Sequence, residues 1–246
     1  GKDYVGGVCG AKYGAVENCY SASTVSGTDC VGGVCGNNYD GILLNCYNTG
    51  AVIGTGYYIG GVCGILNSGK IENCYSTGTV SGTDAVGGVC GYNGYSTISN
   101  CYFDSSKCDK NAVGLNNNGT VEKTEGKTTT QFASGEVAYL LQSGQTADEN
   151  GVTPEVWGQT IGTEDYPVLG GEKVYLTTGE CVYYTNTFFE GEQSHDYVNG
   201  FCTKCGAYQP ATLTTDKYDI NGDGQNDAVY EIGNAGQLYW FAALVN

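Results

Sequence analysis

Four residues near the C-terminus have the types and spacing of a zinc site. Cys181, His195, Cys202 and Cys205 form the pattern Cys-x13-His-x6-Cys-x2-Cys, followed by Gly206, which allows a tight turn. Three thiolates and one imidazole suit tetrahedral Zn²⁺ and leave no open position for water, so such a site is structural. A segment of about thirty residues buries too little surface to fold alone, and zinc adds about 10–16 kcal/mol in such peptides. The alternative is a disulfide from Cys181 to Cys202 or Cys205, with His195 exposed.

The acidic stretch at residues 219–227, Asp-Ile-Asn-Gly-Asp-Gly-Gln-Asn-Asp, is a candidate calcium loop. Oxygen ligands stand at alternating positions, and a glycine at the sixth position permits the sharp turn. The expected side-chain ligands are Asp219, Asn221, Asp223 and Asp227. Position twelve is Tyr230 rather than the glutamate of an EF-hand, so a dockerin-like or linker-type loop fits better. We expect structural calcium that stiffens a hinge between modules; the alternative is a solvated turn.

The composition excludes several classes of function. The chain has 10 Lys, no Arg, one His and 26 acidic residues, for a net charge of −16, which argues against nucleic-acid partners. No apolar run is long enough to span a membrane. We expect no enzymatic activity. The alternative is a carbohydrate-active β-helix, a polysaccharide lyase or hydrolase, which needs two carboxylates about 5–10 Å apart; within the repeats only Asp29 and Asp84 recur at matching positions.

A repeat occupies the first part of the chain. Val-Gly-Gly-Val-Cys-Gly recurs with small changes at residues 5–10, 31–36, 59–64 and 86–91. The tripeptide Asn-Cys-Tyr follows each copy and begins at Asn18, Asn45, Asn73 and Asn100. Short β-branched runs between Gly, Asn and Ser indicate strands and turns. Because one turn cannot bury its own apolar face, the pattern predicts an all-β fold, a parallel β-solenoid of four coils of about 27 residues.

Stacking at about 4.8 Å would place equivalent residues above one another. We expect an asparagine column whose amides bond from rung to rung. Stacked cysteines would have Cβ atoms about 4.8 Å apart, beyond the usual 3.5–4.5 Å of a disulfide, so we expect mostly free buried thiols. Cross-coil pairs such as Cys9 with Cys19 are the alternative. The tyrosine of each Asn-Cys-Tyr either belongs to a platform on which sugars stack or packs against the tyrosines of the neighbouring coils. These tyrosines are Tyr20, Tyr47, Tyr75 and Tyr102.

The two motifs at fixed spacing resemble the GLUG repeat of bacterial secreted and cell-surface proteins. The resemblance covers about residues 1–112 and extends more weakly to residues 132–169, with Trp157-Gly158-Gln159 and Tyr166-Pro167-Val168-Leu169 similar to a closing segment. The family is linked to adhesins and surface proteases. The resemblance therefore implies an extracellular or cell-surface location and an adhesive module or rigid stalk, with glycans or a host surface as candidate partners.

The remaining residues suggest a modular chain. Residues 113–170 are expected to cap the fourth coil with a short helix at residues 134–142, N-capped by Ser134 and followed by Gly144; a separate small subdomain is the alternative. Residues 171–210 would form the Cys/His module. Residues 211–246 would hold the calcium loop and the entry helix of a next module, with a capping box from Asn234 to Gln237. We expect the chain to be part of a longer protein whose other modules are its partners.

Overall fold

The computed structural model describes residues 2–180, 186–203 and 207–245. They form two compact units, Gly1–Val174 and Tyr175–Asn246. Among the described residues, no helix combines the length and apolar character needed to cross a membrane.

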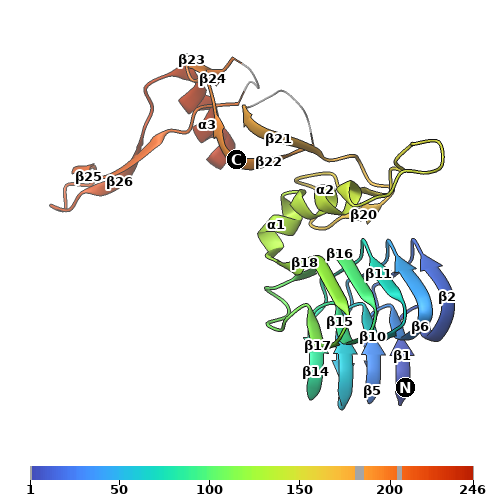
Figure 1. Cartoon of the computed structure of the whole chain (residues 1–246). Helices are drawn as coiled ribbons and strands as arrows, with labels where there is room; N and C mark the ends of the chain where they lie inside the picture. The colour runs from blue at the N-terminus through green and yellow to red at the C-terminus, as the bar shows by residue number, and fades with distance from the viewer. Residues whose placement is uncertain (1, 181–185, 204–206, 246) are drawn as a thin grey trace. The chain divides into compact units, whose positions relative to one another are not determined.

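The first unit contains a parallel β-solenoid, as the repeat predicts (Figure 1). Its longest face stacks five strands: β2 (Cys9–Glu17), β6 (Cys35–Leu44), β10 (Cys63–Asn67), β15 (Cys90–Gly94) and β17 (Val113–Asn117). This sheet continues through β11 (Lys70–Glu72), β16 (Thr97–Asp104), β18 (Thr120–Lys127), β3 (Tyr20–Ser21), β7 (Tyr47–Asn48) and β12 (Tyr75–Ser76). The second sheet contains β1 (Asp3–Gly6), β5 (Asp29–Gly32), β9 (Tyr57–Gly60) and β14 (Asp84–Gly87). The third contains β4 (Val25–Gly27), β8 (Val52–Gly54) and β13 (Val80–Ser81).

Sharp bends between these faces use residues in the left-handed region of the backbone. Asn is among the residues that best tolerate this conformation, and the Asn of each Asn-Cys-Tyr adopts it, with φ between 51° and 54°. Close approach of neighbouring turns requires the glycine pair of each repeat. A Cβ on Gly61 would lie 2.1 Å from the carbonyl oxygen of Gly88 in the next turn. The repeat therefore encodes both where the chain bends and how tightly its turns pack.

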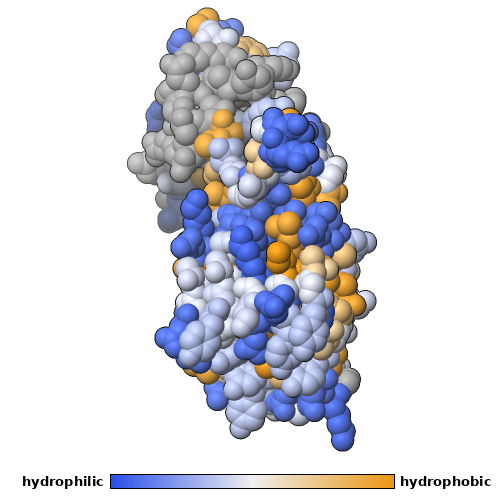
Figure 2. Space-filling model, turned by 45° about the vertical axis from the view of Figure 1, so that its right-hand side comes forward, coloured by the Kyte–Doolittle hydropathy of each residue, from blue (hydrophilic) through white to orange (hydrophobic). Residues whose placement is uncertain are grey.

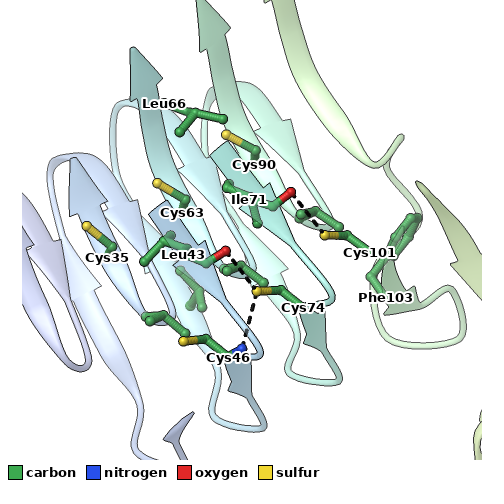
Figure 3. Packing of buried hydrophobic residues seen from close by; sticks show 14 of the residues in the cluster. Cys35, Leu43, Cys46, Cys63, Leu66, Ile71, Cys74, Cys90, Cys101 and Phe103 are labelled. Atoms are coloured by element: carbon green, nitrogen blue, oxygen red, sulfur yellow. Dashed lines mark hydrogen bonds between the residues drawn. The ribbon is translucent and has the colours of Figure 1, made fainter. Parts of the chain in front are cut away.

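The core runs along the inside of the solenoid (Figure 3). Aliphatic side chains from equivalent positions stack from turn to turn and are fully buried: Val34, Val62 and Val89 in one column, and Leu43, Ile71 and Ile98 in another. No single turn could enclose these side chains, so each turn depends on its neighbours for burial.

A fifth turn extends the solenoid beyond the four expected coils. Strand β17 pairs with β15 and β18 pairs with β16, both parallel. Val113 takes the register position of Cys90, and Asn116 that of Asn93, so the stacking pattern continues without the cysteines that marked the repeat. Most residues of these two strands are exposed. The polar fifth turn, rather than the helix, covers the C-terminal end of the core.

Two helices lie along the flank of the solenoid instead of over its last coil (Figure 1). Helix α1 (Thr129–Ala133) starts with a capping box between Thr128 and Gln131, and α2 (Glu136–Ser143) follows. The expected N-cap role of Ser134 is wrong: Ser134 is the C-cap of α1, and Gly135, at φ 86°, precedes α2 because the chain reverses there without a side-chain cap. Gly144 ends α2, as predicted.

The flank cover, residues 128–174, packs on the column of tyrosines. Phe132, Val137, Leu141 and Trp157 are buried together with Tyr75 and Tyr102. The antiparallel pair β19 (Trp157–Gly158) and β20 (Val168–Leu169) completes the cover. Aromatic side chains at these positions attract the helices to the flank because they offer large apolar area there.

The second unit is a small mixed structure. It contains β21 (Tyr175–Glu180), β22 (Thr187–Ser194), β23 (Tyr197–Val198), β24 (Phe201–Cys202), β25 (Thr212–Tyr218), β26 (Asp227–Glu231) and α3 (Ala235–Val245). The amide of Gln237 donates to Asn234 Oδ1 at 2.9 Å, as the capping box predicts, whereas the Gln237 side chain accepts from Gly233 N. Tyr239 of α3 stacks on Tyr208, 5.6 Å between ring centroids.

Candidate functional site

Three rings of the tyrosine column, those of Tyr20, Tyr47 and Tyr75, form one stack that runs from solvent to the flank cover. Tyr20 and Tyr47 stack at 5.0 Å and 9°, and Tyr47 and Tyr75 at 4.9 Å and 8°. Tyr20 is 59% exposed, Tyr47 is half-buried, and Tyr75 and Tyr102 are buried. Because the rings lie face to face, their faces are occupied by one another. Ladder packing therefore describes the buried half, and only the Tyr20 end offers open ring surface.

A pocket of about 320 Å³ opens where the flank cover meets the exposed end of this column. Its lining includes Tyr20, Tyr47, Thr49, Glu164 and Asp165. One wall is fixed in place by a hydrogen bond of 2.5 Å from the Tyr75 hydroxyl to the carbonyl oxygen of Pro167. The sequence analysis identified the tyrosines but not Thr49 or the two carboxylates. The pocket depends on contacts between distant parts of the chain, such as that of Tyr75 with Pro167, 92 positions apart, and no local pattern predicts such contacts.

The asparagine column shows the predicted bond between turns at one place, and it also holds the flank cover. Asn100 Nδ2 donates to Asn73 Oδ1 at 2.7 Å. The same nitrogen of Asn100 donates to the carbonyl oxygen of Leu140 at 3.1 Å, and Asn73 donates to that of Gly144 at 3.3 Å. In the second turn, Asn45 Oδ1 accepts from Gln145 at 2.8 Å. Asn45, Asn73 and Asn100, in three successive turns, are thus each hydrogen-bonded to the flank cover.

All ten cysteines of residues 2–174 are thiols, and the expectation of free, mostly buried side chains is confirmed. Cys63 faces Cys35 and Cys90 in register, which gives a continuous sulfur column (Figure 3). Six of these thiols donate to a carbonyl oxygen two residues away in the chain: Cys74 donates to that of Glu72 at 3.1 Å and Cys63 to that of Ile65 at 3.0 Å. These hydrogen bonds lower the cost of burying the six thiols.

The structure describes two of the four expected zinc ligands. Cys181 and Cys205 lie outside the described residues. His195 is half-buried and stacks on Tyr197, and Tyr197 pairs with Cys202 across the β23–β24 hairpin. Thr203 N donates to Asp196 O at 2.9 Å, which holds the two ends of this hairpin together. His195 lies two residues before β23, and Cys202 lies in β24, the strand paired with β23; zinc binding stays a prediction.

The acidic loop joins β25 to β26 in an antiparallel hairpin, not a helix-flanked loop. Its carboxylates face the loop's own amides: Asp219 accepts from Gly222 at 2.7 Å and Gly224 at 2.9 Å, and Asp227 accepts from Ile220 at 2.8 Å. Across the described ranges, no group of three or more His, Cys, Asp or Glu is placed to hold a metal ion. Asp219, Asn221, Asp223 and Asp227 supply the hard oxygen donors that Ca²⁺ prefers, and calcium binding stays a prediction.

Comparison with known proteins identifies the repeat. The model of the GLUG motif matches three successive segments, residues 27–53, 55–81 and 82–106. No curated protein and no solved structure matched the chain. The matched segments correspond to the second, third and fourth turns, and the first turn pairs with the second strand by strand. The second, third and fourth turns of the solenoid are therefore GLUG repeats.

Proposed function

We propose that the chain is a non-enzymatic repeat region of a bacterial surface or secreted protein, where it acts as a stiff structural segment. The observation that carries this proposal is the bonding of the flank cover to three successive turns through Asn45, Asn73 and Asn100. Such bonds oppose sliding or peeling of single turns. Five turns at about 4.8 Å extend only about 20 Å along the axis, so the segment is a short rigid element.

Charge and candidate metals fit an extracellular setting. A net charge of −16 keeps copies of the chain apart, and Figure 2 shows mostly hydrophilic residues, with small apolar patches, on the visible face. Structural zinc at Cys181, His195, Cys202 and Cys205 and calcium at residues 219–227 would stabilise the small second unit. Both metals stabilise folds that lack a large core.

Force spectroscopy tests the structural role. With handles at both chain ends, residues 2–174 should unfold in one step of about 600 Å, from 173 residues at about 3.6 Å each. Several steps of about 100 Å at low force, one per turn, would contradict the proposal because the turns would then be peeling individually.

A carbohydrate-active enzyme is the second candidate function. The observation in its favour is the pair of adjacent carboxylates, Glu164 and Asp165, beside the tyrosines of the pocket. Incubation with plant and mucin polysaccharides, followed by assay of new reducing ends and of unsaturated products, separates the two functions. Turnover that disappears in Glu164→Gln would establish the enzyme; we expect none.

A further inference from the structure

The pocket at the end of the tyrosine column has the features of a binding site rather than of a packing defect. Its walls come from the Asn-Cys-Tyr corner of the solenoid and from residues 164–168 of the flank cover. These segments are held against one another by the hydrogen bond from Tyr75 to Pro167 and by the edge contact of Trp157 with Tyr47 at 5.8 Å. The pocket is therefore pre-formed, as small-molecule sites usually are.

The aromatic wall offers an apolar surface with a free end. Tyr20 stacks on Tyr47 through one face, and its side chain is 59% exposed. Stacking against Tyr47 fixes the Tyr20 ring without burying it. A ligand that packs on this ring therefore meets a surface already held in one orientation, which lowers the entropy lost on binding.

The polar wall offers carboxylate oxygens that are held in place and can still accept hydrogen bonds. Glu164 Oε2 accepts a hydrogen bond of 2.6 Å from Thr160 N, which orients the carboxylate. Its other oxygen, Oε1, takes no hydrogen bond from any residue that the structure describes, and Asp165 is exposed beside it. Burial, then the neighbouring Tyr20, then Glu164 raise the pKa of Tyr47, which agrees with a negative charge close to the ring.

We propose that this pocket binds a neutral glycan. The weakly polar C–H face of a sugar ring would pack on Tyr20, and its hydroxyl groups would donate to Glu164 Oε1 and Asp165. The volume of about 320 Å³ lies at the small end of ligand sites, with room for one or two sugar units. Two carboxylates in the pocket and a chain charge of −16 oppose sialylated or uronic-acid glycans by like-charge repulsion.

Titration calorimetry with the whole chain tests this assignment, using neutral oligosaccharides terminated by glucose, galactose or mannose and matched sialylated and uronate-containing glycans. We expect saturable binding of at least one neutral glycan, weakened at least tenfold by Tyr20→Ala and by Glu164→Gln. Tyr13→Ala is the matched control, because Tyr13 is also exposed and stacked, on Tyr39 at 5.6 Å, but does not line the pocket.

Each other outcome overturns the proposal. Absence of binding to every neutral glycan removes the ligand class, and preference for the acidic glycans contradicts the charge argument. Equal affinity of Tyr20→Ala and the wild type places binding elsewhere on the chain. Thermal unfolding checks that the three variants remain folded. We expect them to do so, since Tyr20 and Glu164 are not part of the buried core. None of these results bears on the single unfolding step under force, so the structural role is judged separately.

Discussion

The buried thiol columns predict that the protein loses stability in mild alkali. Cys35, Cys46, Cys63 and Cys74 are fully buried. Burial is the main cause that raises the thiol pKa at Cys63 and Cys74, whereas a hydrogen bond to the thiol of the next turn is the main cause at Cys35 and Cys46. An unfolded cysteine titrates near pH 8.5. Above that pH the unfolded chain releases protons that the folded chain keeps, so the free energy of unfolding falls as pH rises from the unfolded pKa toward the folded one.

The magnitude follows from the number of thiols. Between about pH 8 and about pH 9.5, each thiol that stays protonated in the folded state lowers the free energy of unfolding by about 1.3 kcal/mol. These four thiols give at least about 5 kcal/mol, comparable with the whole stability of many domains. Cys9 and Cys30 add to this loss, because their thiol pKa is raised as well. Tyrosines contribute little in this window, because unfolded tyrosine titrates near pH 10.

Urea unfolding with a reductant present, at both pH values, measures this loss. In the double variant Cys63→Ala, Cys74→Ala the decrease should be about 2.6 kcal/mol smaller than in the wild type, whatever the variant's stability at the lower pH. The single variant Cys63→Ala, in which the decrease should be about 1.3 kcal/mol smaller, serves if the double variant does not fold. A wild-type change below about 1 kcal/mol, or an unchanged decrease in the variants, would refute the reasoning.

Four further predictions follow from contacts described above. Gly61→Ala should lower the free energy of unfolding by about 3 kcal/mol or more, because its Cβ would overlap the Gly88 carbonyl; chemical denaturation checks this. Asn100→Ala should cost about 2 kcal/mol more than Asn18→Ala, because both residues have a left-handed backbone but only Asn100 is bonded to the flank cover; equal losses would contradict that role. Calcium should bind at millimolar concentration or tighter and be lost in Asp219→Ala, by calorimetry. One equivalent of zinc should be found in reduced protein by elemental analysis and be lost in Cys202→Ser; metal-free reduced protein would reject the site.

The periodic part of the fold could be predicted because equivalent residues of successive repeats occupy equivalent positions in successive turns. The nearly constant spacing of Asn-Cys-Tyr predicted the solenoid. Stacking of its turns then predicted the bond between asparagines and the free thiols. The fifth turn escaped prediction because it keeps the stacking positions, such as Val113 and Asn116, while replacing the cysteines that marked the other copies. Strand pairing depends on shape and register, which survive that change of residue type.

The pocket and the position of the helices could not be predicted from local patterns. The helix of the flank cover was expected over the last coil, because the open end of a solenoid exposes apolar surface. In the structure the polar strands β17 and β18 close that end, and the tyrosines provide the apolar area that α2 covers. The different exposure of the four equivalent tyrosines, from the exposed Tyr20 through the half-buried Tyr47 to the buried Tyr75 and Tyr102, arises from this tertiary contact. Glu164 joins the site only through the same contact.

The flank cover also limits how such an array can change in length. It is bonded to the second, third and fourth turns at fixed intervals along the axis, and the fifth turn lies beyond them. Insertion or loss of a repeat among these turns would move the asparagines out of step with residues 140–145. Duplication on the N-terminal side of the second turn would leave every one of those bonds intact. The array therefore has a fixed end and an extensible end, and unequal recombination between repeats should be tolerated only toward the N-terminus.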